Sequence, residues 1–302
     1  MTLGVVMSTT SDAGVGSAVE AQLSAARQGW WHVEVECRGV ADEIVETLSE
    51  LGPPYAYTVV PENVMAVDGA IPHQVIATTK EQIHAAYTEM HKIVQVNKLN
   101  ALTEIRTDWY IFIEGIGESE FVENGEKFDS PHAVLFPTHG GVGISGELFW
   151  LPTQSTWLGD GSSDRWAERL PVLKIHERLV ECLRTHNVDG VIALTRPNAQ
   201  TCIRDYVEET GGLNELHSTD ELRSYLDAFY DRFRVVSIDL LHRHISHWMM
   251  FAELLWTVEL KSGPQTGERR QFRTAEHAEV AADGMITARI GHGTPLVPAP
   301  QH

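Results

Sequence analysis

Cysteine and positive charge are both scarce in this chain of 302 residues. The three cysteines, Cys37, Cys182 and Cys202, lie far apart and form no Cys-x-x-Cys pair. They exclude a disulfide framework and suit a reducing compartment. Lys and Arg number 23 against 42 Asp and Glu, which gives a net charge of −19. Such a field repels polyanions, so nucleic acid and anionic membrane surfaces are poor partners.

Long apolar runs are absent as well. No stretch approaches the roughly 18 apolar residues that indicate a membrane-spanning helix. Residues 1–26 contain neither Lys nor Arg, with which a secretory signal begins. We therefore expect a cytoplasmic protein without a membrane partner. Residues 1–35 are predicted to form an N-terminal arm, and residues 296–302 a tail.

A repeat is present along the chain. Two runs typical of β-strands, residues 108–114 and 247–253, share Trp, Phe and Glu at a separation of 139 residues. The matching pairs are Trp109 with Trp248, Phe112 with Phe251, and Glu114 with Glu253. Downstream, His132 matches His277 at a separation of 145, which predicts a longer hairpin in the second half. The turn-forming run 263–267, Gly-Pro-Gln-Thr-Gly, supplies that hairpin.

Each half shows the same predicted order of elements. A first helix is expected over 40–51 and over 169–185. A tyrosine-bearing segment follows, and then a second helix, over 81–94 and 221–232. The second helices begin at the capping boxes Thr78-x-x-Glu81 and Ser218-x-x-Glu221.

Three or four long antiparallel strands complete each half. Helices followed by a strand meander are typical of an α+β domain, with the helices on one face of a curved sheet. The predicted domains are residues 36–155 and 160–295, joined by the Gly-, Ser- and Asp-rich stretch 152–165.

The strand over 248–256 is apolar on both faces, because both its even and its odd positions are mostly hydrophobic. A strand of this kind must be covered on both sides. We expect helices on one side, and the partner domain or a second chain on the other.

Three pieces of the second half carry a family resemblance: Arg204-Asp205-Tyr206-Val207, the strand 248–256 and the closing segment 283–290. With the order of elements, they make the chain resemble the nuclear transport factor 2-like superfamily, which includes SnoaL-type polyketide cyclases and ketosteroid isomerases. The resemblance covers residues 165–295 well and residues 40–150 more loosely. It implies two cone-shaped domains, in each of which a curved antiparallel sheet wraps helices and encloses an apolar pocket. Since family members pair through the outer faces of their sheets, it also implies an intramolecular pseudo-dimer, with a further homodimer or homo-oligomer allowed.

Glu253 and Glu114 interrupt otherwise apolar strand faces at equivalent places. A carboxylate in apolar surroundings resists ionisation and is suited to proton transfer near neutral pH. The structural alternative is an ion pair with an arginine, such as Arg289 or Arg243. His132 and His277 follow on the next strand, where the resemblance implies a general acid or base, and where a packing histidine is the alternative.

Arg204-Asp205-Tyr206 and Tyr55-Ala56-Tyr57 precede the second helix of their halves. The resemblance places this region at the pocket mouth, where a tyrosine donates a hydrogen bond to a substrate oxygen. Alternatively, the tyrosine covers the helix pair and Asp205 is an exposed partner of Arg204.

His242-x-His244-x-x-His247 is the densest histidine cluster. Imidazoles at i and i+2 share a strand face, as in some metal sites, but no spacing indicates a third ligand. We predict no metal and no cofactor, and a pocket role for His244. The metal-dependent alternative is a hydrolase or oxygenase built on His242 and His244.

The predicted catalytic residues are Glu253, His277, Tyr206, His244 and Asp205. The predicted substrate contacts are Tyr57, Asp108, Glu114, His132, Met249 and Phe251. Together they predict a cofactor-independent acid/base enzyme, a lyase or dehydratase, isomerase or cyclase, acting on a bulky apolar or aromatic small molecule. The alternative is a non-catalytic small-molecule binding or dimerisation protein of the same fold.

Overall fold

The computed structural model describes residues 56–59, 74–77, 92, 94–137, 147–150, 166–208, 213–246, 248–281 and 283–300. The chain divides into two compact units, residues 1–151 and 152–302. Several expected features lie outside the described residues: the N-terminal arm, the helix over 40–51, the capping box at Thr78, most of the helix over 81–94, the join at 152–165, and His247. The expected end of the helix at residue 94 is wrong, because residue 92 lies in a turn and residue 94 begins a strand. Among the described residues, no helix combines the length and apolarity needed to cross a membrane.

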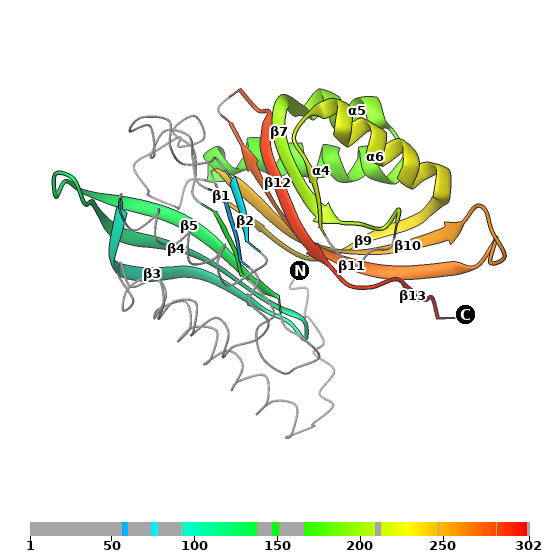
Figure 1. The fold of residues 1–302 in the computed structure, drawn as a ribbon, viewed down its shortest axis with the longest axis horizontal. Helices are drawn as coiled ribbons and strands as arrows, with labels where there is room; N and C mark the ends of the chain where they lie inside the picture. Colours follow the sequence, from blue (N-terminus) through cyan, green and yellow to red (C-terminus); the bar gives the residue numbers. More distant parts are fainter. Residues whose placement is uncertain are drawn as a thin grey trace, which may run out of the picture. The chain divides into compact units, whose positions relative to one another are not determined.

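The described part of the second unit combines three helices with a curved, mostly antiparallel sheet. Its elements are α4 (Trp166–Arg184), α5 (Val188–Leu194), β7 (Thr195–Arg204), β8 (Leu213–Leu216), α6 (Thr219–Arg232), β9 (Phe233–Ile245), β10 (Met249–Leu260), β11 (Arg269–Val280), β12 (Ile286–Gly293) and β13 (Val297–Pro298). The strand order is β8-β7-β12-β11-β10-β9, with β12 and β7 parallel. All three helices lie on one side of this sheet (Figure 1). The predicted α+β class is confirmed for this unit.

Both predicted helices of the second unit are present within a few residues of their expected bounds. Ser218 caps α6, since its hydroxyl accepts the Glu221 N–H at 3.2 Å, and the Glu221 carboxylate accepts the His217 N–H at 2.6 Å. One side of α6 is buried at a helical spacing, through Leu222, Leu226, Phe229 and Tyr230. The cap and the stripe therefore set where α6 begins and which way it faces. The short strand β13 pairs with β11, so the expected tail begins with two residues that belong to the sheet.

The alternation of side chains along β10 decides which of its residues point toward the helices. Even-numbered residues of β10, from Met250 to Val258, belong to one buried cluster with the apolar stripes of α4 and α6. Odd-numbered residues of β10 therefore lie on the opposite face. The hairpin register extends this division to β11, because Leu254 pairs with Thr274 and Glu253 with Ala275.

The described part of the first unit is a sheet with the same strand order. Its strands are β1 (Ala56–Val59), β2 (Gln74–Ala77), β3 (Val94–Arg106), β4 (Tyr110–Phe121), β5 (Lys127–Pro137) and β6 (Glu147–Trp150). The order β2-β1-β6-β5-β4-β3 repeats that of the second unit strand for strand, including a parallel pair, β1 with β6. Both bounds of β3 and β4 precede those of β9 and β10 by 139 residues. The separation predicted from the Trp, Phe and Glu matches is therefore the separation of the strands themselves.

The second hairpin is longer, as predicted, but by less than the histidine match indicates. Tyr110 pairs with Pro137 and Met249 with Glu279, so the separation after the turn is 279 minus 137, or 142 residues rather than 145. The predicted equivalence of His132 and His277 is wrong, because the register aligns His277 with Leu135. The matching His-Ala pairs are displaced by three residues, an odd number, so they do not share a strand face.

Candidate functional site

A cavity lies on the helix side of the second unit's sheet. This aromatic cavity holds about 450 Å³ of empty space, counted with the solvent at its open mouth. Its walls are rich in rings from α6, β10 and β11 and from the residues after β7. The rings are those of Tyr206, Tyr225, Phe229, Tyr230, Trp256 and Phe272. An apolar, ring-rich lining of this kind is typical of a small-molecule site.

The aromatic side chains of the cavity wall are held in place by hydrogen bonds from their own N–H and O–H groups. Trp256 donates its indole N–H to the Thr274 hydroxyl at 3.1 Å, and its ring stacks on Phe272 at 5.5 Å between centroids. Three tyrosine hydroxyls donate to backbone carbonyls: Tyr206 to Thr294 at 3.0 Å, Tyr225 to Arg204 at 3.2 Å and Tyr230 to Leu183 at 2.9 Å. Burial raises the pKa of Tyr206, which therefore stays neutral at physiological pH. Tyr206 lines the cavity as expected, but its proton is directed at a carbonyl of the chain.

The charged groups in the wall are Arg204 of β7, whose Nη1 donates to the Gly293 carbonyl at 3.1 Å, and the pair formed by Glu276 of β11 and Arg289 of β12. Arg289 approaches Oε2 of Glu276 through Nη2 at 2.6 Å and through Nε at 2.8 Å. Only 11% of the Glu276 side chain and 6% of the Arg289 side chain are exposed. Both contacts use Oε2, so Arg289 leaves Oε1 of Glu276 unengaged. The buried Nη1 of Arg289 has no hydrogen-bond partner in the structure. The pair thus presents one carboxylate oxygen and one cationic donor beside an apolar space.

Two glycines of β12 make room for this arrangement. Gly291 pairs with Glu276 and Gly293 with Thr274, so both lie on the face that Arg289 occupies. A Cβ at Gly291 would come within 2.6 Å of Cγ of Glu276, and a Cβ at Gly293 would overlap the Tyr206 hydroxyl. The spacing Arg289-x-Gly291-x-Gly293 is therefore a steric requirement of the site.

A second, smaller space, which we call the His176 cavity, is lined by the same ion pair. It shares Leu183, Glu276 and Arg289 with the aromatic cavity. His176 lies in the buried stripe of α4 between Val172 and Leu179, and its Nδ1 has no hydrogen-bond partner. Burial lowers the pKa of His176 from 6.5 to about 4, helped by the positive charges of Arg243 and Arg289 and opposed by Glu276. The imidazole is therefore neutral near pH 7.

Glu253 and His277, the first two predicted catalytic residues, lie elsewhere. Both occupy odd positions, on the sheet face opposite to the helices, and line neither of these two cavities. We expected both side chains to face the pocket inside the cone. This expectation is wrong, because odd-numbered residues of β10 and β11 lie on the other face of the sheet. Because β10 is apolar on both faces, its pattern alone did not reveal which face the helices cover. Met249 and Phe251, two predicted substrate contacts, lie on that same opposite face.

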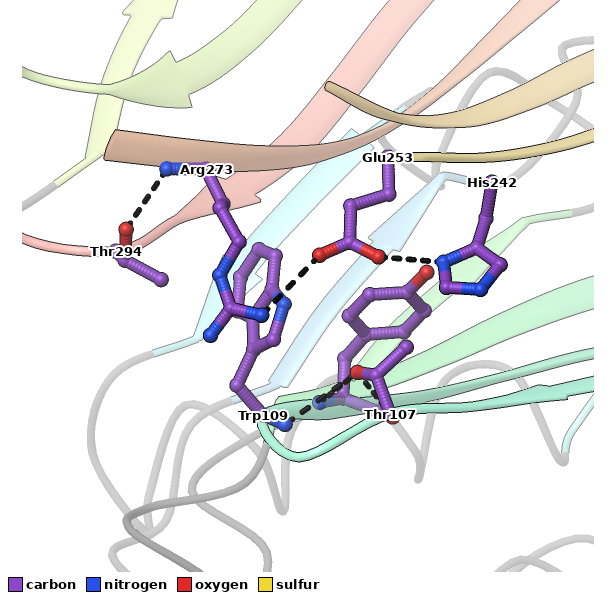
Figure 2. A network of polar contacts seen from close by, with 7 residues as sticks. Thr107, Trp109, His242, Glu253, Arg273 and Thr294 are labelled. Carbon is purple, nitrogen blue, oxygen red and sulfur yellow. Dashed lines mark hydrogen bonds and ion pairs between the residues drawn. The ribbon is translucent and has the colours of Figure 1, made fainter. Parts of the chain in front are cut away.

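Glu253 takes part in a polar network instead (Figure 2). Its Oε2 lies 2.7 Å from Nδ1 of His242, and its Oε1 lies 3.5 Å from Nη1 of Arg273. The backbone N–H of Arg273 in turn donates to the Thr294 hydroxyl at 2.8 Å. An ion pair was the structural alternative for Glu253, and the arginine is Arg273 rather than Arg289 or Arg243.

The remaining histidines and acids of the second unit are also placed. His242 and His244 pair with Glu253 and Phe251, so they share a strand face as predicted, but it is the face away from the helices. Among the described residues, no group of three His, Cys, Asp or Glu side chains could hold a metal ion. Asp205 is buried, not exposed beside Arg204, and its Oδ1 accepts the N–H groups of Val207 and Glu208. An aspartate with this pair of hydrogen bonds stabilises a turn.

The predicted contacts of the first unit lie on separate elements. Tyr57 is a residue of β1, where a segment before a helix was expected, and His132 is a residue of β5. Asp108 is exposed in the turn between β3 and β4. In that turn the Thr107 hydroxyl accepts the N–H of Trp109 at 3.3 Å and of Tyr110 at 3.1 Å (Figure 2). Glu114 is buried in β4 and pairs with Ala133.

Sequence reasoning did not assign Glu276, Arg289 or His176 to the site. Two signals could have found them. His176 is a polar residue within a helical stripe that is otherwise apolar, and the alternating glycines after Arg289 indicate bulky neighbours on that face.

Comparison with known proteins supports the resemblance for the second unit. Residues 176–289 match the family model of the SnoaL-like domain, a span that begins at His176 and ends at Arg289. A search of curated proteins finds no match.

Similar solved structures include a putative polyketide cyclase from Xanthomonas campestris pv. campestris (14% identity, 41% of this chain and 91% of that chain covered, TM-score 0.34). The Δ5-3-ketosteroid isomerase of a Mycobacterium species is similar over 43% of this chain and 98% of its own, with 14% identity and a TM-score of 0.35. A Mycobacterium tuberculosis protein in complex with estradiol-17beta-hemisuccinate is similar over 40% of this chain and 92% of its own, with 16% identity and a TM-score of 0.34.

Proposed function

We propose that the second unit is a cofactor-independent acid/base enzyme for a bulky apolar or aromatic small molecule that carries a carbonyl group. The reaction class is isomerisation, cyclisation or loss of water. The observation that carries this proposal is the buried pair of Glu276 and Arg289 in the wall of the aromatic cavity. The SnoaL-like match over residues 176–289 supports it at the level of the domain.

Charge balance disfavours a cationic substrate. Arg289 and Glu276 neutralise each other and Arg204 adds a positive charge, so an ammonium group would bring an uncompensated charge into a largely apolar space. A ketone or ester oxygen brings no charge and can accept from the unpartnered Nη1 of Arg289. The ring-lined walls would hold the rest of the molecule.

In the proposed reaction, Oε1 of Glu276 removes a proton from the carbon next to the carbonyl. The C–H electron pair forms the enolate double bond, and the negative charge moves to the oxygen beside Arg289. Returning the proton at another carbon gives an isomer, and expulsion of a β-hydroxyl with that proton gives water and an alkene. A positioned base contributes about 10²–10⁴ in rate and an oxyanion donor about 10²–10³. These side chains therefore suffice for the chemistry.

The experiment that tests this proposal follows proton removal rather than a particular product. Steroid-type, polyketide-type and lignin-type aromatic ketones are incubated with the protein in D₂O, and loss of the proton next to the carbonyl is followed by NMR. Glu276→Gln should slow the exchange by about 10²–10⁴-fold, because an amide cannot accept the proton. Glu253→Gln is the matched control on the opposite sheet face and should exchange as the wild type does. Equal exchange in Glu276→Gln and the wild type would remove the assignment.

A non-catalytic binding protein is the second candidate. The observation that favours it is the commitment of all three cavity tyrosines to backbone carbonyls, which leaves few donors for a reacting oxygen. Tight binding of the same ketones, with no exchange in D₂O by any of them, would select this function.

We also propose that the two units are copies of one ancestral domain. The identical strand order and the 139-residue separation of two consecutive strands support a tandem duplication. An experimental structure tests this: a first-unit hairpin whose register departs from the 142-residue separation would contradict it.

A further inference from the structure

The aromatic cavity reaches solvent near the end of β7. Most of its lining residues are buried, whereas Arg204, Tyr225, Glu276 and His292 are partly exposed. Arg204 is the last residue of β7, and its backbone carbonyl accepts the Tyr225 hydroxyl of α6 at 3.2 Å. Arg204 therefore lies at the mouth of the cavity, where a bond from α6 holds the end of the strand.

Arg204 carries a positive charge that no carboxylate of the described residues balances. Its Nη1 donates to the Gly293 carbonyl at 3.1 Å, and its other N–H groups make no hydrogen bond or ion pair within the described part of the chain. By contrast, Arg196 on the same strand pairs with Asp283 at 2.7 Å. A guanidinium group presents five N–H donors in a planar fork that suits a carboxylate. Arg204 is thus held in place by one donor and keeps the others for a ligand.

The charges of the cavity lining sum to one positive charge. Glu276 and Arg289 approach each other to 2.6 Å and cancel, so Arg204 is the excess. Burial raises the pKa of each of the three cavity tyrosines, which therefore stay neutral near pH 7. His292, when protonated, adds only to the positive charge. A ligand group with a single negative charge would therefore neutralise the lining, and an ammonium group would not.

We infer that the ligand of the aromatic cavity is an acid, whose ring-bearing apolar body lies among the aromatic side chains and whose carboxylate binds the guanidinium group of Arg204 at the mouth. This names the ligand class of the proposed small-molecule site, on which it rests, but does not depend on catalysis. A carboxylate at the mouth stays partly hydrated, so it loses less hydration energy than it would in the depth of the cavity. For the proposed reaction, in which a neutral carbonyl accepts from Arg289, the substrate is then a ring-bearing acid that also carries a ketone or an ester.

Four small probes test the inference by binding alone. Phenylbutanoate, phenylbutanamide and phenylbutylamine share a benzene ring and a four-carbon chain but differ in charge, and butanoate keeps the carboxylate without the ring. Affinities are measured by titration calorimetry on the full chain at pH 7. Phenylbutanoate should bind about five- to twentyfold more tightly than phenylbutanamide, as charge-assisted hydrogen bonds at a half-exposed site allow. Phenylbutylamine should bind most weakly of the three, and butanoate roughly tenfold more weakly than phenylbutanoate, because it buries no ring.

Three results of this titration would overturn the inference. The first is equal affinity for the acid and the amide, since the charge would then contribute nothing. The second is the absence of measurable binding of phenylbutanoate at millimolar concentration. The third is equal affinity for butanoate and phenylbutanoate, which would mean that Arg204 attracts an adventitious ion only.

Variants at two positions of β7 separate the bond from the overall charge. Arg204→Gln removes the charge but keeps an N–H donor for the Gly293 carbonyl, so it should weaken phenylbutanoate to the level of phenylbutanamide and leave the amide unchanged. Arg204→Lys keeps the charge without the fork and should retain part of the preference. Arg196→Gln is the matched control, because it removes one positive charge from the same strand outside the cavity, and it should bind every probe as the wild type does. Equal losses in Arg196→Gln and Arg204→Gln would contradict a specific site.

Two further readouts locate the carboxylate and keep the inference apart from the proposed function. Circular dichroism confirms that each variant is folded. Phenylbutanoate should shift the guanidinium Nε–H resonance of Arg204, which is assigned by its loss in Arg204→Lys, and phenylbutanamide should shift it less. An unchanged resonance at saturating phenylbutanoate would place the carboxylate elsewhere. None of these probes carries a ketone, so failure of the D₂O exchange experiment would leave these results standing, and loss of the acid preference would leave exchange of neutral ketones standing.

Discussion

Gly293 of β12 lies against the hydroxyl group of Tyr206. A Cβ at position 293 would overlap the phenolic oxygen and come within 3.1 Å of Cζ of the ring. The close approach lets the hydroxyl reach the Thr294 carbonyl at 3.0 Å and brings the ring over Phe272, with 3.9 Å between centroids. The absence of a side chain at one position of β12 therefore sets where a wall of the aromatic cavity stands.

Gly293→Ala should displace Tyr206 and lower the free energy of unfolding by about 1–3 kcal/mol, the usual effect of overpacking. Urea unfolding followed by tryptophan fluorescence measures it. The matched control is Gly293→Ala combined with Tyr206→Phe, in which the overlapping oxygen is gone, so part of the loss should be recovered. Equal destabilisation of the single and the double variant would show that the hydroxyl is not the obstacle.

The ion pair of Glu276 and Arg289 should contribute little net stability, yet be costly to break. Glu276→Met leaves a buried guanidinium group without its partner and should lower the free energy of unfolding by about 3–5 kcal/mol. In Glu276→Met combined with Arg289→Met, the free energy of unfolding should return close to the wild-type value or exceed it. Two apolar side chains carry no charge, so burying them costs no desolvation energy. Additive losses in the double variant would mean that the two side chains do not act as a pair.

His176 should make the fold less stable in acid. Its pKa is about 4 in the folded protein and 6.5 in the unfolded chain, so between these values only the unfolded chain takes up the proton. Stability is therefore complete above pH 6.5 and falls as the pH is lowered toward 4, by about 3 kcal/mol in total. Urea unfolding at pH 7 and pH 4.5 measures the loss. His176→Leu, which cannot be protonated, should lose less over the same interval, and parallel behaviour of the two proteins would contradict the burial of His176.

Much of the second unit could be predicted from local signals. The cap at Ser218 and the apolar spacing of α6 lie within one short segment, so they predict the helix without knowledge of the fold. The even and odd faces of β10 were also predictable from alternation. The choice between those faces was not, because it depends on which residues of α4 and α6 pack against them, and both faces of β10 are apolar.

The candidate site required long-range information. Glu276 precedes His277 by one residue, and that single step decides between the cavity and the opposite face. Arg289 was considered only as a partner of Glu253, whereas β12 brings it beside Glu276. The match of His132 with His277 failed for a related reason: the second hairpin is longer by three residues, not by the six that the match requires, and this difference of three is an odd number.

Glu279 should oppose His176 in its effect on pH dependence. This carboxyl is buried on the sheet face away from the helices, and its described hydrogen bond comes from the Thr287 hydroxyl at 3.3 Å. Burial raises its pKa from 4.5 to about 8, an effect that the Thr287 bond reduces in part. Between these values the folded protein keeps the proton and the unfolded chain releases it. The contribution to stability is thus complete below pH 4.5 and is lost as the pH rises through 8, with a size on the order of 5 kcal/mol.

Glu279→Gln should remove that loss, because an amide imitates the protonated carboxyl and does not titrate. We expect the variant to unfold at a similar urea concentration to the wild type at pH 5, and at a clearly higher one at pH 8.5. Glu208→Gln, at an exposed position, is the control and should follow the wild type at both values. If Glu279→Gln were no more stable than the wild type at pH 8.5, the carboxyl would have to ionise in place. The face of the sheet away from the helices would then have to be wet at Glu279.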